Sequence, residues 1–186
     1  NTNSSLEELD ISYSDGIDDK ALLTFASEYA IARNTSLKTL EFARFSTELR
    51  LEFARFSTKQ ISTSVWGTLF RSLLNPVSVL EKLNLYGHNI NDDGLNVLGN
   101  VLGNNSTLKV LNLGRCRNIT SAGWLTLFER LSNGPITALE DLDVRCNNID
   151  DVGLASFANV VSNNPKLKCL CLGDNPSISA AGWQTF

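Results

Sequence analysis

The chain has 186 residues, of which 42% are hydrophobic and 19% are charged, and its formal net charge is −4. Such proportions are typical of a folded globular protein, not of a disordered or fibrous one. The slight acidity argues against a nucleic-acid-binding protein, which normally presents a strongly basic surface. Apolar runs are only a few residues long, far short of the roughly 18 to 20 that span a bilayer, so we expect no membrane span.

The two ends of the sequence indicate a fragment of a longer protein. There is no Met in the chain and no signal-peptide pattern at its start, and the last residues stop partway through a recurring pattern. Four cysteines lack the spacing of a disulfide framework or a paired CxxC zinc site: Cys116, Cys146, Cys169 and Cys171. Reduced thiols of this kind favour a cytoplasmic (intracellular) location, although glycosylation sequons such as Asn3-Ser-Ser point the other way.

A repeated unit runs along the whole chain. Each unit contains an LxxLxL phrase followed by an isoleucine, and these isoleucines are Ile17, Ile61, Ile90, Ile119, Ile149 and Ile178. The intervals between them are 44, 29, 29, 30 and 29 residues. Self-similarity at a period of about 20 to 50 residues is the signature of a solenoid or another repeat architecture.

Each unit predicts one strand followed by one helix. In the second half of LxxLxL the apolar residues alternate at i and i+2, which is strand periodicity. Beyond the isoleucine the spacing changes to three and four, as in Trp124, Leu127, Phe128 and Leu131, which is a helix stripe. Because helices are about 10 Å across and parallel strands lie about 4.8 Å apart, a stack of such units must curve with its strands on the concave side. The crossover rule makes the stack right-handed.

The pattern LxxLxLxx(N/C)xI, followed by Gly and a helical leucine stripe in units near 29 residues, resembles the ribonuclease-inhibitor-like class of leucine-rich repeats. The resemblance covers residues 1–186 as one domain of about six units. It implies an α/β fold, a right-handed curved solenoid (horseshoe) with parallel strands on the concave face and helices on the convex face. In that class the slot three residues after LxxLxL is usually Asn or Cys. Here the slot holds Ser14, Phe45, His88, Cys116, Asn147 and Asn175.

Two features repeat with a period of two units. Trp66, Trp124 and Trp183 mark every second unit. The second position of LxxLxL alternates in charge along the chain: Glu7, Lys38, Glu81, Lys109, Glu140 and Lys168. On neighbouring parallel strands these side chains would face each other, so we expect a structural ladder of exposed ion pairs.

One interval is longer than the rest because the second unit contains a tandem duplication within residues 40–58. The segment Leu40-Glu-Phe-Ala-Arg-Phe-Ser-Thr47 recurs without change from Leu51 to Thr58. Either copy can supply the strand of this unit while the other forms a loop. The duplication is either an accident or an insertion that shapes the binding face, and the sequence does not separate these interpretations.

Side chains between the leucines of each strand are predicted to point to the concave surface, where this class generally binds its partners. The candidate partner-binding residues are Asp10, Tyr13, Arg44, Asn84, Tyr86, Asn112, Arg115, Asp143, Arg145 and Asp174. Tyr and Arg are frequent hot-spot residues in protein interfaces. Because the charges are mixed in sign, they favour a protein partner over a polyanion; a solvated polar face without a partner is the alternative.

No residue set points to catalysis, a metal or a cofactor. His88 is the single histidine and has no nucleophile at a fixed spacing, so a hydrogen-bonded structural role is expected. The cysteines and His88 are too scattered for a tetrahedral zinc site. The acidic pairs Asp18-Asp19, Asp92-Asp93 and Asp150-Asp151 stand just before predicted helices, where carboxylates cap helix N-termini. No phosphate-binding glycine loop occurs.

We therefore expect a non-enzymatic scaffold that binds a protein partner of unknown identity through its concave face, without nucleic acid or a cofactor. The resemblance also allows a regulator of an enzyme, of the GTPase-activator or nuclease-inhibitor type, or the sensor region of a NOD-like receptor. An attached nucleotide-binding domain would favour the sensor. GTPase stimulation by the purified chain would favour the activator.

Overall fold

The computed structural model describes residues 5–12, 14, 17–26, 36–42, 61–74, 78–133 and 138–186. Six strands and six helices alternate along these described residues. The strands are β1 (Glu8–Asp10), β2 (Thr39–Glu41), β3 (Lys82–Asn84), β4 (Val110–Asn112), β5 (Asp141–Asp143) and β6 (Cys169–Cys171). The helices are α1 (Asp19–Thr24), α2 (Thr63–Leu73), α3 (Asp92–Leu102), α4 (Ser121–Asn133), α5 (Asp151–Asn163) and α6 (Ala180–Thr185). Each strand and the helix after it form one unit, numbered 1 to 6.

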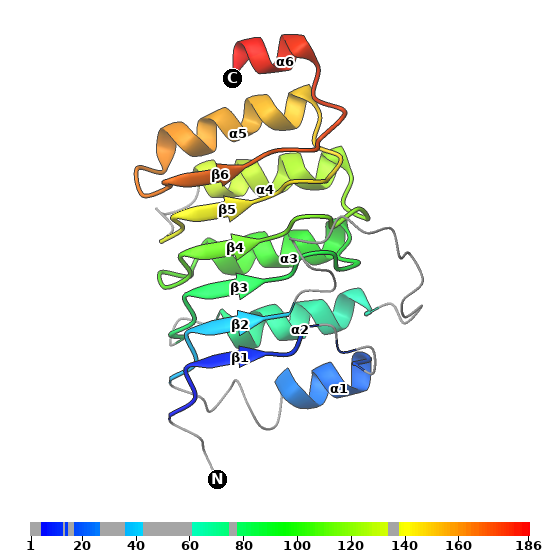
Figure 1. Cartoon of the computed structure of the whole chain (residues 1–186), viewed down its shortest axis with the longest axis vertical. Helices are drawn as coiled ribbons and strands as arrows, with labels where there is room; N and C mark the ends of the chain where they lie inside the picture. The colour runs from blue at the N-terminus through cyan, green and yellow to red at the C-terminus, as the bar shows by residue number, and fades with distance from the viewer. Residues whose placement is uncertain are drawn as a thin grey trace.

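The strands form one open parallel sheet in chain order, β1 to β6, and the helices form a second layer beside it (Figure 1). The strands pair in register, which places the central leucines in one row: Leu9, Leu40, Leu83, Leu111, Leu142 and Leu170. This arrangement confirms the predicted α/β solenoid, in which strands and helices alternate and the strands form a parallel sheet. Within the described residues no helix is long and apolar enough to cross a membrane.

The core lies between the sheet and the helices. The central leucines of β2 to β5 are almost completely buried, as are Trp66 and Trp124. Each of these tryptophans stacks on the phenylalanine one helical turn later, with ring centroids 5.6 Å apart for Trp66–Phe70 and 5.8 Å apart for Trp124–Phe128. The third tryptophan, Trp183, is 47% exposed, because its helix α6 contacts only the helix before it.

The first copy of the duplicated segment supplies the strand of unit 2. Leu40 pairs with Leu9 on one side and Leu83 on the other. The second copy, from Leu51 to Thr58, lies outside the described residues, and so does the loop-slot residue Phe45. The register of the sheet is therefore continuous across the unit that contains the duplication.

The predicted charge ladder is present on the edge where the strands begin. Three ion pairs join neighbouring units, with N–O distances of 3.0 Å for Lys38–Glu7, 3.0 Å for Lys109–Glu81 and 2.7 Å for Lys168–Glu140. The hydrogen bond and charge of Glu7 raise the pKa of Lys38, and the charge of Glu81 in the following unit adds to this effect. Lys38 therefore interacts with glutamates on both sides of it. All these groups are solvent-exposed, so the ladder favours one register more than it adds stability.

The acidic pairs have two separate roles. Asp18 and Asp150 cap α1 and α5 as predicted, whereas Asn91 takes this place in α3. The acid directly after each N-cap, Asp19, Asp92 or Asp151, instead reaches the next unit, where it accepts a hydrogen bond from the backbone N–H of the residue before the helix. The N–O distances are 2.9 Å for Ser62–Asp19, 2.8 Å for Thr120–Asp92 and 2.7 Å for Ser179–Asp151.

The loop slot forms a second ladder, inside the stack. The Asn147 side-chain amide donates to the carbonyls of Leu113 (3.0 Å) and Val144 (2.9 Å), which belong to two different units. Asn175 repeats the arrangement one unit later, and the buried Cys116 thiol donates to the Leu85 carbonyl (3.5 Å). Burial raises the pKa of Cys116 to about 12, so this thiol has a packing role and not a reactive one.

The contact between Asp92 and α4 predicts an unusual response to substitution at Gly123. A Cβ atom there would lie 2.3 Å from Asp92 Oδ1, whereas at the equivalent Gly153 the nearest acid oxygen would be 3.5 Å away. Both positions share a similar contact with the preceding isoleucine, at 3.1 Å. We expect Gly123→Ala to be less stable than Gly153→Ala by about 1 kcal/mol or more, because Asp92 must release its bonds to Thr120.

Urea unfolding followed by circular dichroism measures this difference. An Asp92→Ala background is the control, since it removes the clash and the bonds together, and there Gly123→Ala should cost no more than Gly153→Ala. Equal stability of the two single variants in the wild-type background would contradict the proposed role of Asp92.

Candidate functional site

The face of the sheet turned away from the helices is the candidate site, and we call it the open face. Side chains alternate along a strand, so residues on either side of each central leucine lie on this face. Two rows result, each with one residue per strand. The first row is Glu8, Thr39, Lys82, Val110, Asp141 and Cys169. The second row is Asp10, Glu41, Asn84, Asn112, Asp143 and Cys171.

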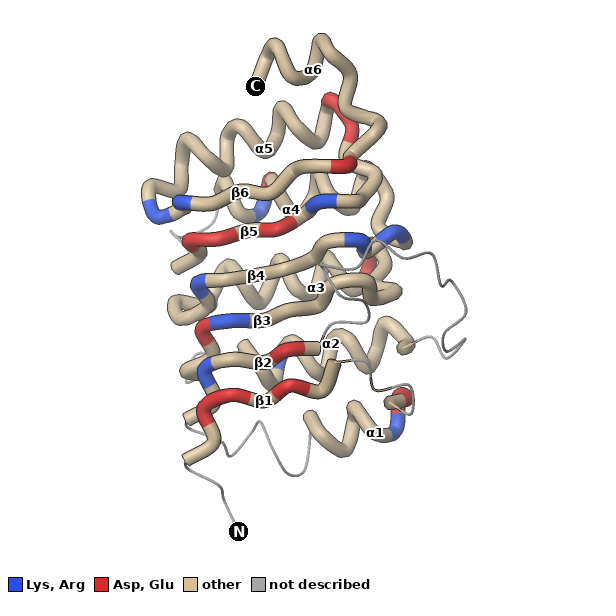
Figure 2. Tube along the Cα trace, in the orientation of Figure 1, with Lys and Arg blue, Asp and Glu red and all other residues tan. Residues whose placement is uncertain are grey.

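The structure gathers most of the predicted partner-binding residues at one end of this face. Asp10, Asn84, Asn112 and Asp143 belong to the second row, and the remaining described members lie just beyond it, where the strands end: Tyr86, Arg115, Arg145 and Asp174. Tyr13 and Arg44 lie outside the described residues. Figure 2 shows that acidic residues mark β1, β2 and β5 while basic residues lie on β3 and near the ends of other strands, so the face is mixed in charge.

The second row also ends the strands, a role that sequence reasoning missed. Four side chains accept a hydrogen bond through Oδ1 from the backbone N–H two residues later: Asp10 (2.8 Å), Asn84 (3.0 Å), Asn112 (2.9 Å) and Asp143 (3.0 Å). In these Asx turns a side-chain oxygen takes the backbone N–H that would otherwise form a β-sheet hydrogen bond to the neighbouring strand. The bond from Ser12 lowers the pKa of Asp10. Each of these residues therefore has only part of its polar surface available to a partner.

Left-handed backbone conformations recur directly after the strands. Gly87 has φ 79°, and the equivalent residues of the next three units have φ 56° (Arg115), 60° (Cys146) and 55° (Asp174). Their amides continue the pairing of units, since Arg115 N donates to Arg145 O (2.9 Å) and Cys146 N to Gly173 O (2.9 Å). Glycine adopts this conformation freely, whereas a residue with a side chain is strained there. Units 4, 5 and 6 nevertheless have a residue other than glycine at this left-handed position.

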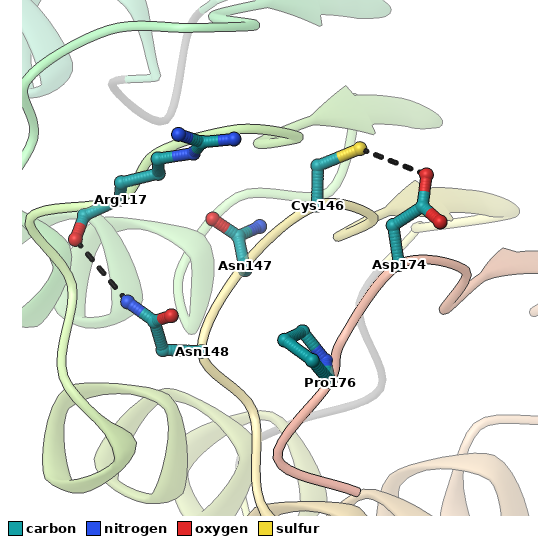
Figure 3. Close-up of a pocket in the computed structure, with 6 residues that line it drawn as sticks. All are labelled: Arg117, Cys146, Asn147, Asn148, Asp174 and Pro176. Carbon is teal, nitrogen blue, oxygen red and sulfur yellow. Dashed lines mark hydrogen bonds between the residues drawn. The ribbon is translucent and has the colours of Figure 1, made fainter.

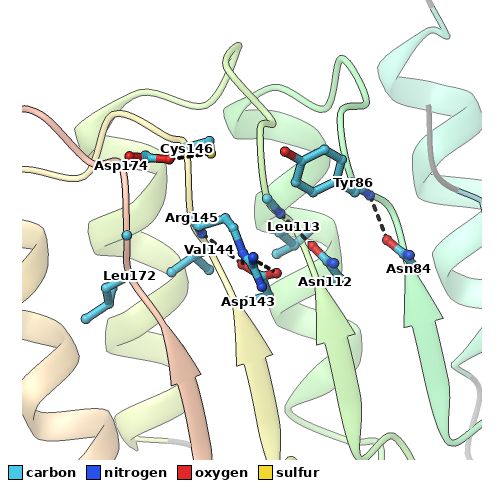
Figure 4. A network of polar contacts seen from close by, with 12 residues as sticks. Asn84, Tyr86, Asn112, Leu113, Asp143, Val144, Arg145, Cys146, Leu172 and Asp174 are labelled. Atoms are coloured by element: carbon cyan, nitrogen blue, oxygen red, sulfur yellow. Dashed lines mark hydrogen bonds and ion pairs between the residues drawn. The ribbon is translucent and has the colours of Figure 1, made fainter. Parts of the chain in front are cut away.

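Tyr86, one of the candidate partner-binding residues, is largely buried, with only 6% of the residue exposed. Its ring lies against the backbone of unit 4, where a Cβ on Gly114 would be 2.6 Å from the Tyr86 ring. Burial, and after it the neighbouring Cys146 of unit 5, raises the pKa of the phenol. Tyr86 therefore packs from the strand end of unit 3 onto unit 4 (Figure 4).

Asp143 and Arg145 form an ion pair along one strand end. Arg145 Nε lies 2.9 Å from Asp143 Oδ1 and 2.8 Å from Oδ2. The Asp143 side chain is 8% exposed and the Arg145 side chain is 40% exposed. The hydrogen bond that Arg145 donates to Asp143 raises the pKa of Arg145. The guanidinium is thus held in place with one side facing solvent, while Asp143 is largely covered.

A hollow of about 450 Å³ lies beside these residues, among the loops that follow β4, β5 and β6 (Figure 3). It is lined by Arg117, Cys146, Asn147, Asn148, Asp174 and Pro176. Across it the Cys146 thiol donates to Asp174 Oδ2 (3.5 Å), and Asn148 Nδ2 donates to the Arg117 carbonyl (3.4 Å). The lining is polar and carries both charges, which suits a peptide loop better than an apolar ligand.

The single histidine of the chain has a packing position. His88 is 6% exposed and packs between aromatic rings, with centroids 4.2 Å from Phe42 and 5.2 Å from Trp66. Among the described residues, no group of three or more His, Cys, Asp or Glu side chains is placed to hold a metal ion. The polar side chains at the strand ends are held by one another and by backbone amides.

A comparison with known families matches the description "Leucine Rich repeat" over residues 2–26, 78–99, 104–127 and 137–158, which is half of the chain. The chain belongs to the leucine-rich repeat family. No curated protein sequence matches it. The matched segments coincide with units 1, 3, 4 and 5 of the solenoid.

Two solved structures resemble this leucine-rich repeat chain. Leiomodin-1 actin-binding site 2 has a TM-score of 0.51 and 16% sequence identity, and the match covers 100% of this chain and 79% of that chain. A chain of the yeast Rad7 and Elc1 complex has a TM-score of 0.50 and 17% identity, with coverage of 97% of this chain and 46% of that chain. At these identities the likeness concerns the fold alone.

Because Tyr86 packs on Gly114, a side chain added at position 114 should lower the stability of this leucine-rich repeat. We expect Gly114→Ala to destabilise the fold by about 1 to 3 kcal/mol, because the added methyl group must displace the Tyr86 ring. Gly173 is the equivalent residue of unit 6, and a Cβ there would meet nothing within 4 Å. Gly173→Ala is therefore the matched control and should change stability little.

The free energies come from urea unfolding, and a double-mutant cycle with Tyr86→Ala tests the mechanism. The cost of Gly114→Ala should fall by at least about 1 kcal/mol in the Tyr86→Ala background. Additive effects would show that the two residues are not in contact.

Proposed function

We propose that the chain is a non-enzymatic scaffold that binds a protein partner across its open face, chiefly at the end where the strands stop. The surface there consists of the exposed parts of Asn112, Arg115, Arg145 and Asp174, with the polar hollow next to them. This is the concave surface of the predicted horseshoe.

The proposal rests chiefly on three successive units in which a residue other than glycine adopts a left-handed backbone conformation. At Arg115, Cys146 and Asp174 glycine would be the unstrained choice, as at Gly87. Strained conformations that persist in a fold are concentrated at functional sites. Three such residues lie side by side on neighbouring units and bring a cation, a thiol and an anion to one edge of the face. A partner with a matching pattern of charges would meet side chains that are already positioned, which reduces the entropy lost on binding.

The similar structures agree with this class of function. One is an actin-binding site of leiomodin-1, and the other is a complex of Rad7 with Elc1. Each of them therefore has a protein partner, although neither partner can be transferred to this chain at 16% or 17% identity. No described feature favours the GTPase-activator, nuclease-inhibitor or receptor-sensor alternatives over a general scaffold.

Photo-crosslinking locates the binding face directly. A photoreactive amino acid replaces Val110, which lies in the first row of the open face, or Asn159, which is exposed on α5. We expect a partner from an extract of the source organism to crosslink at position 110 and not at position 159. Equal crosslinking at both positions, or crosslinking at 159 alone, would place the interface elsewhere.

Substitutions then identify the contributing side chains. Arg115→Asn and Asp174→Asn each remove a charge and introduce asparagine, a residue type that tolerates left-handed backbone. Each should weaken binding of the crosslinked partner by about 1 kcal/mol or more, roughly fivefold in Kd. Glu129→Gln on the exposed surface of α4 is the matched control and should leave Kd unchanged. Unchanged Kd for both open-face variants would contradict the proposal.

A further inference from the structure

Two cysteines lie next to each other on the open face at one edge of the sheet. Cys169 and Cys171 flank Leu170 on β6, so both thiols emerge on the same face of the strand. Cys169 is exposed and Cys171 is partly exposed, and both are free thiols. β6 is the last strand of the described sheet (Figure 1), so on its far side no strand follows.

The neighbouring strand β5 places charged residues beside both thiols. In the pairing of β5 with β6, Asp141 is the partner of Cys169 and Asp143 is the partner of Cys171. Arg145 is held by its ion pair with Asp143, and the hydrogen bond to Asp143, with a smaller contribution from the charge of Cys171, raises the pKa of Arg145. The strand therefore presents two sulfur atoms on one face, with a cation on the adjacent strand.

The spacing disfavours a direct disulfide. Two residues along a strand separate the Cα atoms by about 6.6 Å, close to the outer limit of about 6.8 Å for disulfides. An ion between the sulfurs can span a wider gap than an S–S bond of about 2.05 Å. The thiol pair is thus better arranged to share an ion than to oxidise.

The number of ligands selects the kind of ion. No set of three or more His, Cys, Asp and Glu side chains surrounds a metal position in the part of the chain that the structure describes. Zinc sites normally need four ligands, and hard ions prefer oxygen. Two thiolates without further ligands suit a soft monovalent ion, and Cu(I) is the biological member of that class.

We propose that Cys169 and Cys171 form a two-coordinate thiolate site for Cu(I). Binding replaces two S–H bonds by two S–Cu bonds and releases two protons, so that one Cu(I) and two thiols give a complex with a charge of −1. Copper stays in the same oxidation state and no oxidant is required. The Arg145 guanidinium opposes the new negative charge, and Asp141 takes no part as a ligand.

Competition for Cu(I) under anaerobic conditions tests the site. The full 186-residue chain is reduced beforehand and then competes with the chromogenic chelator bathocuproine disulfonate for Cu(I), with excess glutathione present as a competing monothiol. We expect one Cu(I) per chain. Cys169→Ser and Cys171→Ser should each lower the affinity at least tenfold, because one thiol loses the advantage of chelation. Cys146→Ser, at a partly exposed thiol on the next loop, is the matched control and should bind like the wild type.

Two further results decide the ligand set. In the wild type, Cu(I) should protect Cys169 and Cys171 together from iodoacetamide while Cys146 still reacts, as read by mass spectrometry. Asp141→Asn should not weaken binding, because Asp141 is the largest cause of the raised pKa of Cys169 and its removal eases loss of the thiol proton.

Wild-type affinity in either Cys169→Ser or Cys171→Ser, or equal protection of all exposed thiols, would mean adventitious binding and overturn the site. A tenfold loss in Asp141→Asn would also overturn it, since the carboxylate would then be a ligand. Thermal unfolding shows whether each variant is folded, and the protection experiment requires no variant.

Discussion

The in-register row of six leucines, one from the centre of each strand, is the constraint on which the rest of the structure depends. A three-residue strand with one buried leucine has no stability of its own, so each unit is held by the units on either side. The parallel ladder fixes where every other side chain lies, because a shift of one residue would turn the leucines to solvent and bring the charged neighbours into the core. The open face, the charge ladder and the loop slot are consequences of that one register.

Neighbouring units are not equivalent, and they associate in pairs. Units 1, 3 and 5 supply a glutamate before the strand and an aspartate as the first residue of the helix. Units 2, 4 and 6 supply the lysine, the N–H before their own helix and the tryptophan. Both sets of polar contacts therefore join unit 1 to 2, 3 to 4 and 5 to 6. Between pairs, contacts such as the Asn147 amide bonds and the helix packing of α4 on α5 continue the stack.

Sequence reasoning predicted the features that depend on residue type and period within one unit. The strand and helix order, the leucine core, the Glu–Lys ladder and the caps at Asp18 and Asp150 all follow from such local patterns. The burial of Tyr86 was missed because it depends on a residue of the next unit, Gly114, whose missing side chain makes room for the ring. The acids directly after the N-caps, Asp19, Asp92 and Asp151, were also assigned too locally. The glycines at 123 and 182 were the available signal, since each leaves space for an aspartate of the preceding unit. The left-handed backbone at Arg115 and Cys146 has no sequence signal, because neither residue type favours it.

The pairing of units limits how a chain of this kind can change length. Loss of unit 3 alone would bring Lys38 next to Lys109, and loss of unit 4 alone would place the Asp92 carboxylate against Asp150 at the start of the following helix. Either deletion brings side chains of the same charge together. Removal or gain of two consecutive units preserves every glutamate–lysine and aspartate–amide contact. The two-unit block, and not the single repeat, is therefore the module in which this solenoid can be shortened, extended or recombined without loss of complementarity.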